Sequence, residues 1–196
     1  MRTPSSSRRG DRVSTQDLRR AFRDAPWSTL FSTALGAGLS PIAPGTAGSA
    51  VGLVLAWLVA TSLGSSHGPS VAAAVGLLMS GLVVAAVGVP IATRTCRQLQ
   101  AKDPGCIVID EVAGQLLSVC PAPLFLYPNR SAEIGVWLLS FFAFRFFDVV
   151  KPGPVRRLQE LPEGLGVVVD DVLAGLLAAG TVAVAAWVVS GGKPWT

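Results

Sequence analysis

The sequence predicts an all-α, polytopic membrane protein with about five apolar helical segments in one domain. Three observations lead to this class. The 196-residue chain is 51% hydrophobic and only 14% charged, whereas ordinary soluble domains carry roughly 25% charged residues. Its apolar residues gather into runs that approach or reach the roughly 20 residues needed to cross a bilayer. Carboxylates stand at the edges of three of these runs, where ionisable groups are rare and usually face a functional interior.

The first 26 residues form a basic tail ahead of the apolar membrane domain, residues 27–196. The tail holds seven of the sixteen Lys and Arg residues of the chain. We expect residues 1–13 to be disordered because they are polar. Ser14 or Thr15 is expected to cap a short basic helix that lies in solvent or at the membrane surface. Beside membrane segments, this charge indicates orientation and contact with anionic lipid rather than nucleic-acid binding.

The first two apolar segments are separated by a short turn. Pro41 and Pro44 interrupt any continuous helix in the glycine-rich stretch 36–49. We therefore expect a loop there, followed by a first segment at about residues 47–63, near the lower length limit for spanning. The second segment, about residues 70–93, is long enough to cross.

The other three segments follow a basic connection. The third, about residues 107–126, contains two prolines, so we expect its far end to be broken. The fourth, 133–150, ends before Pro152. A polar connection then leads to the fifth segment, about residues 169–190. The chain thus offers five candidate crossings.

The distribution of Lys and Arg predicts the orientation of these segments. Residues 1–46, 94–106 and 151–168 together hold thirteen of the sixteen basic residues. Because cytoplasmic loops are enriched in Lys and Arg, these three parts are expected in the cytoplasm. The carboxylates at the segment edges, and the stretch 36–49, then lie together at the cytoplasmic boundary of the membrane.

Five carboxylates share this boundary position. Clustered carboxylates repel one another, so a bundle that holds several needs a compensating cation. Mg²⁺ prefers a few carboxylates together with water and phosphate oxygens. The sequence therefore predicts one Mg²⁺ site, with ligands drawn from Asp110, Glu111, Asp148, Asp170 and Asp171.

A phosphate group is the expected partner of this metal. The glycine-rich stretch can bring backbone N–H groups close to a phosphate, and Lys151 can bind phosphate as a point charge one turn after Asp148. These parts suit metal-assisted phosphoryl transfer. The expected phosphate-binding residues are Ser40, Gly45, Thr46, Gly48, Ser49 and Lys151.

Each pattern also has a simpler interpretation. Either acid pair alone could be helix-start charge favoured by the helix dipole, small residues can serve tight helix packing, and Lys151 can anchor the membrane edge. The same acids could line a small ion or proton pathway, although none lies at mid-membrane. Histidine and cysteine phosphatase chemistry is excluded, because His67 is the single His and no Cys has an Arg six positions later.

Four motifs in order carry a resemblance to a known family. They are GAGLSPIAPGTAGS (36–49), DPGCIVIDEVAG (103–114), FRFFDVVKPGPVR (144–156) and GLGVVVDDVLAG (164–175). Over about residues 27–190 the chain resembles the phosphatidylglycerophosphatase A family. The resemblance implies a Mg²⁺-dependent lipid phosphatase at the inner face of a bacterial membrane. Its substrate would be an anionic phospholipid, phosphatidylglycerol phosphate, cleaved to phosphatidylglycerol and inorganic phosphate.

The resemblance also implies roles for individual residues. By position, the five acids and Lys151 match the acidic residues and the lysine of the family, which makes these six the expected catalytic residues. Asp103 matches a further polar position and joins the expected substrate-binding residues. The metal and Lys151 would stabilise developing charge while water attacks phosphorus, with Asp170 or Asp171 as nucleophile the alternative. The chain departs from some relatives at residues 161–163 and at Gly153, where those carry a His-Gly pair and a Trp.

Overall fold

The computed structural model of the chain describes residues 13–65, 68–151 and 163–192. Within these ranges the regular elements are all helical, as predicted. The α-helices are α1 (Thr15–Asp24), α2 (Pro26–Ser32), α3 (Pro44–Ser62), α4 (Val71–Leu99), α5 (Ile109–Val119), α6 (Arg130–Val150) and α8 (Glu163–Val189), with short 3₁₀ turns at Ala37–Leu39 (η1) and Ala122–Leu124 (η3). Residues 1–12 of the stretch expected to be disordered lie outside the described residues, as do residues 66 and 67 within the short turn expected between the first two segments.

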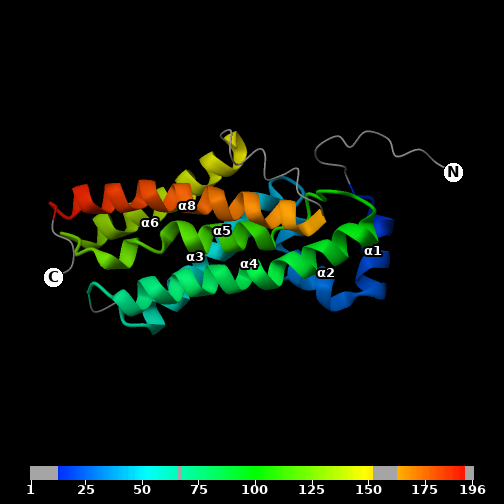
Figure 1. Cartoon of the computed structure of the whole chain (residues 1–196), viewed down its shortest axis with the longest axis horizontal. Coiled ribbons are helices and arrows are strands. Elements are labelled where there is room, and N and C mark those ends of the chain that lie inside the picture. The colour runs from blue at the N-terminus through cyan, green and yellow to red at the C-terminus, as the bar shows by residue number, and fades with distance from the viewer. Residues whose placement is uncertain (1–12, 66–67, 152–162, 193–196) are drawn as a thin grey trace.

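Helix α5 is the centre of the bundle. Every residue of α5 except Glu111 is buried, and α5 contacts α3, α4, α6 and α8. Figure 1 shows the long helices running side by side along the molecule, with α1 and α2 gathered at one end. Because successive long helices alternate in direction, α3, α5 and α8 start toward that end, and α4 and α6 finish toward it. The edges of the apolar segments are thereby brought together.

Three described helices are long and apolar enough to cross a membrane: Pro44–Ser62, Val71–Leu99 and Gly164–Val189. With 21 residues, α6 is long enough but carries four charged residues. Helix α5 has 11 residues, about 16 Å at 1.5 Å per residue, and cannot by itself cross a core of about 30 Å. The expected third segment is therefore a short buried helix that ends before Pro121 and continues as the turn η3. The predicted break at its far end is confirmed.

The N-terminal helices are tied to the bundle end that holds the start of α5. The side chain of Ser14 caps α1 by accepting a hydrogen bond from the Asp17 backbone N–H at 3.1 Å, as one of the two expected caps. Buried Ala21 packs with Leu99 and Cys106. The carbonyl of Ser32, the last residue of α2, accepts a hydrogen bond from the Val108 N–H at 2.8 Å. This bond holds the residue immediately before α5.

Helices α5 and α8 approach at backbone distance. A Cβ at Gly175 in α8 would lie 2.5 Å from the carbonyl oxygen of Gly114 in α5. A Cβ at Gly114 would collide with the ring of fully buried Phe144 in α6. Small residues at such crossings allow close packing in membrane bundles. The close approach places Asp171, one turn before Gly175, beside the first turn of α5.

Gly175→Ala should therefore destabilise the bundle. The added methyl has no room, and overpacking costs about 1–3 kcal/mol. Gly180→Ala, on the same helix, is the matched control because nothing lies within 4 Å of a Cβ there. It should be neutral or more stable by up to about 1 kcal/mol, since Ala favours helix. Unfolding in detergent followed by circular dichroism measures both, and equal stability of the two variants would contradict the close approach.

Candidate active site

A pocket of about 380 Å³ lies among the ends of α3, α5, α6 and α8. It collects all five predicted acids together with Lys151, although these residues are spread over some sixty positions of the chain. Most of these side chains are buried: the exposed fraction is 6% for Asp110, 3% for Asp171 and 1% for Asp170. The residues that line the pocket and bear on its chemistry are Gly45, Thr46, Asp103, Asp110, Glu111, Arg145, Asp148, Lys151, Asp170 and Asp171.

Three of the acids face one another, and basic groups reach two of them only at the long distance of 4.0 Å: Arg145 Nη1 from Glu111 Oε1 and Lys151 Nζ from Asp171 Oδ1. Asp110, Glu111 and Asp171 each offer a carboxylate oxygen, and these oxygens all lie within 4.8 Å of one another. One buried oxygen of each (Oδ1, Oε2 and Oδ2 respectively) has no hydrogen-bond partner among the described residues. Buried carboxylates are costly unless they are paired or bind a cation. The donor set is all oxygen, as Mg²⁺ requires, so these residues fit the predicted metal.

Lys151 lies among three of the acids and makes its closest contact with Asp170. Its Nζ donates to Asp170 Oδ2 and lies 3.7 Å from Asp148 Oδ1 and 4.0 Å from Asp171 Oδ1. Lys151 ends α6 in the left-handed conformation (φ 44°), with its backbone N–H donating to Phe147 O at 2.9 Å. Burial lowers the pKa of Lys151, but the carboxylates of Asp171, Asp170 and Asp148 outweigh this and raise it above its ordinary value. Lys151 therefore keeps its positive charge near neutral pH.

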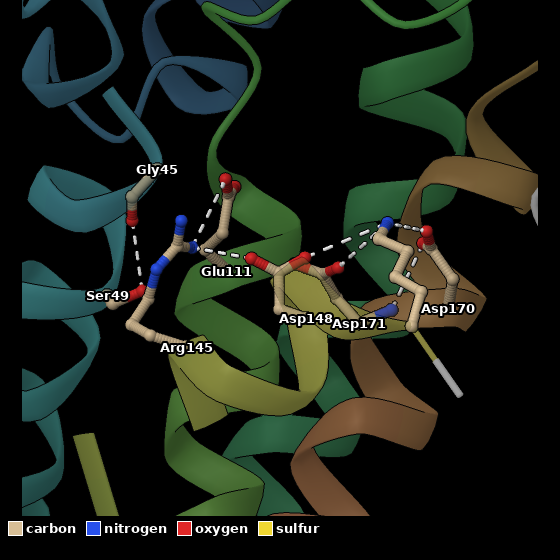
Figure 2. Close-up of polar contacts among 8 residues, drawn as sticks. Gly45, Ser49, Glu111, Arg145, Asp148, Asp170 and Asp171 are labelled. Carbon is tan, nitrogen blue, oxygen red and sulfur yellow. Dashed lines mark hydrogen bonds and ion pairs between the residues drawn. The ribbon is translucent and has the colours of Figure 1, made fainter. Parts of the chain in front are cut away.

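Arg145 is a site residue that the sequence analysis did not select. Its Nη1 lies 2.7 Å from Asp148 Oδ2 and 4.0 Å from Glu111 Oε1. Figure 2 shows the Arg145 guanidinium pointing toward both carboxylates, with Gly45 on its other side and Asp148 between Arg145 and the pair Asp170 and Asp171. The available signal was a lone Arg within an apolar Phe-rich run, three residues before Asp148 on the same helix face.

Some residues of the glycine-rich stretch line the pocket, and others pack against neighbouring residues. The predicted loop ends at Ala43, because Pro44 is tolerated in the first turn of α3. Of the predicted phosphate-binding residues, Gly45 and Thr46 line the pocket, and so does Asp103.

Three other predicted residues are not brought to the pocket. A Cβ at Gly48 would lie 2.7 Å from the Cβ of Val108, so Gly48 serves close packing of α3 against the start of α5. The Ser49 hydroxyl donates to Gly45 O at 2.9 Å. Ser40 lines a neighbouring groove beside α1.

Cysteine chemistry finds no support near the pocket. None of Cys96, Cys106 and Cys120 forms a disulfide bond. Burial raises the pKa of the Cys106 thiol to about 11, so this side chain stays protonated near neutral pH and is a poor nucleophile.

The apolar bundle and its buried charged pocket define a helical membrane enzyme. The family model for phosphatidylglycerophosphatase A matches residues 30–186, from the end of α2 to the last turn of α8. The chain belongs to the phosphatidylglycerophosphatase A family.

Curated relatives agree with this membership. A phosphatidylglycerophosphatase A of Haemophilus influenzae is 32% identical over 76% of this chain and 82% of its own length. That of Escherichia coli is 31% identical over 79% of this chain and 80% of its own. A protein of Bacteroides thetaiotaomicron, named provisionally as a phosphatidylinositol-3-phosphatase, is 33% identical over 82% of this chain and 94% of its own. No solved structure shows a significant match to the chain.

The division of the acids predicts opposite effects on stability without metal. Asp110→Asn and Asp171→Asn remove repulsion and should leave the protein at least as stable as the parent in chelator. Asp170→Asn leaves buried Lys151 short of a charged partner and should cost about 3 kcal/mol. Melting temperatures in detergent test this, with Glu133→Gln at the far end of α6 as control. Added Mg²⁺ should raise the melting temperature of the parent more than that of Asp171→Asn. Equal melting temperatures for all variants would contradict the division.

Proposed function

We propose that the protein hydrolyses the terminal phosphomonoester of phosphatidylglycerol phosphate, an anionic phospholipid, giving phosphatidylglycerol and inorganic phosphate. Family membership and two relatives that carry this activity in their names support the reaction. The structural observation that carries the proposal is the pocket, in which three carboxylates with free buried oxygens face two basic side chains.

In this proposal Mg²⁺ is held by Asp110, Glu111 and Asp171, each of which offers one carboxylate oxygen to a cluster within 4.8 Å. When bound, the ion supplies a Lewis acid that neutralises charge on phosphate oxygens. Asp148 and Asp170 act differently from these three, because they make the closest ion pairs, with Arg145 and Lys151 respectively. They would orient the side chains of Arg145 and Lys151 and lie near the metal without binding it directly.

The basic side chains would bind the phosphate. Arg145 Nη1 and Lys151 Nζ both approach Asp148, at 2.7 Å and 3.7 Å from its two oxygens. A phosphomonoester entering from the side of Gly45 and Thr46 would meet both cations, and a guanidinium can engage two phosphate oxygens at once. These charges are in place before the reaction and would stabilise negative charge that develops on the phosphate.

A free carboxylate oxygen is also needed to accept a proton from attacking water or to attack phosphorus directly. Of the two nucleophiles considered from the sequence, Asp170 has one oxygen bound to Lys151 and the other accepting from the Asp171 N–H at 3.1 Å. Asp171 keeps Oδ2 without a hydrogen-bond partner among the described residues. The geometry favours Asp171 over Asp170 for either role.

An ion or proton pathway is the weaker alternative. The acids lie together in the pocket among the starts of α3, α5 and α8 and the end of α6. Below them, fully buried Gln115 donates to the hydroxyls of Ser118 and Ser140 at 3.1 and 3.2 Å. This uncharged network joins α5 to α6, and beyond it lies the apolar cluster that contains Leu116 and Val119. The described residues thus offer no continuous charged path through the bundle.

The first activity test removes single charges. Asp→Asn at positions 110, 148, 170 and 171, Glu111→Gln and Arg145→Gln should each lower phosphate release about a hundredfold, because charges that act in the transition state are typically worth about 3 kcal/mol or more.

Excess chelator should abolish turnover and Mg²⁺ should restore it. Asp24→Asn, at the end of α1 in an exposed pair with Arg23, should stay within about threefold of the parent. Full turnover in chelator, or parent rates for most variants, would contradict the shared site.

A second test concerns sidedness. We propose five crossings, the third made by α5 together with residues 120–129 that follow it. The pocket would then lie at the cytoplasmic side of the bacterial inner membrane, because the loops at that end carry most of the Lys and Arg. In a background without native Cys, an impermeant thiol reagent applied to intact cells should label Ser131→Cys but not Lys102→Cys. Permeabilised cells should show labelling at both positions. The reverse pattern in intact cells would invert the orientation.

A further inference from the structure

A second cavity lies between α3 and α6, away from the acids. It holds about 370 Å³ and is almost entirely apolar over most of its length. Its α3 wall is formed by Leu53, Val54 and Trp57, and its α6 wall by Ile134, Trp137 and Leu138. Arg130 and Glu133 close its far end and form an ion pair at 2.8 Å. We call this cavity the α3–α6 groove.

The groove continues the line of the acidic pocket along the same two helices. The pocket is lined by Gly45 and Thr46 at the start of α3 and by Arg145 and Asp148 near the end of α6. From Thr46 to Leu53 is seven residues, about 10 Å along the helix axis. Helices α3 and α6 each pack on α5 but touch each other little. A seam therefore runs between them, charged at one end and apolar beyond.

The seam is charged at one end and apolar beyond, and this order matches a lipid with a terminal phosphate. In phosphatidylglycerol phosphate, the terminal phosphate is separated from the acyl chains by a glycerol and a phosphodiester, a span comparable with the distance from pocket to groove. We propose that the α3–α6 groove seats an acyl chain of the lipid whose terminal phosphate occupies the acidic pocket. This inference rests on the proposed function and assigns the groove as the chain-binding part of the substrate site.

The groove differs from an ordinary lipid-facing helix surface. Such surfaces are convex, as on α8, where Val184 and Leu176 are exposed but line none of the cavities described here. The groove is concave and flanked by two Trp side chains, which are rigid and present large apolar area. Its closure by the Arg130–Glu133 pair limits the length of chain that it can take.

The test fills the groove and compares matched positions. Val54→Trp and Leu138→Trp place bulk in the groove from its two walls. Val184→Trp and Leu176→Trp are controls on α8 with similar exposure: 58% for Val54 against 65% for Val184, and 48% for Leu138 against 47% for Leu176. Each variant is purified in detergent, checked by gel filtration and melting temperature, and assayed with dipalmitoyl and with dibutyryl phosphatidylglycerol phosphate.

Filling the groove should lower kcat/KM for the dipalmitoyl lipid about tenfold relative to the matched control, a size typical of lost apolar contacts in a binding pocket. The dibutyryl compound, whose chains end short of the groove, should be cleaved by filled and control variants alike. If its turnover is too slow to measure, the comparison on the dipalmitoyl lipid alone decides.

Two failures are distinguishable in this experiment. If the filled and control variants have equal kcat/KM on the dipalmitoyl lipid and the parent is active, the groove does not bind an acyl chain, and the proposed function stays intact. A parent that releases no phosphate from either lipid in Mg²⁺ would overturn the proposed function itself. If folded filled variants lose kcat/KM equally on both lipids, the added bulk disturbs the acidic pocket. That result would also overturn the proposal that the groove binds an acyl chain.

Discussion

The structure depends on holding more buried negative than positive charge in one small volume. Five carboxylates meet two basic side chains at the ends of apolar helices, where desolvation makes every unpaired charge costly. Lys151 and Arg145 satisfy Asp170 and Asp148, and Asp110, Glu111 and Asp171 are left facing one another. The close packing of α5 against α8 at Gly114 and Gly175 makes this concentration of charge unavoidable, because it removes the space in which the acids could separate.

The helical class, the order of the segments and the gathering of acids could be predicted from the sequence. Apolar runs, prolines and charge at run edges are local signals, and each α-helix from α3 onward covers much of a predicted segment. The length of α5 was harder to predict from the sequence. A run of apolar residues looks the same whether it crosses a membrane or is buried within a bundle, and α5 is apolar because four other helices surround it.

The different roles of the charged residues could not be predicted from the sequence. Asp110, Asp148, Asp170 and Asp171 look alike in their motifs, and their difference arises from which side chains the packed helices bring within reach. Arg145 enters the site only because its face of α6 meets the start of α3 and α5. Gly45 and Gly48 likewise differ by one helical turn, which turns the first to the pocket and the second onto Val108.

The positions of these charges in the chain also bear on how the protein is assembled. Synthesis proceeds from the N-terminus, so Asp110 and Glu111 emerge first, Arg145 and Lys151 follow with Asp148, and Asp170 and Asp171 come last. Both cations thus join the nascent bundle between the two acidic pairs. When α8 packs onto α5, its carboxylates meet a partly neutralised surface instead of bare negative charge. The order of translation thus supplies both cations before the last two acids are made.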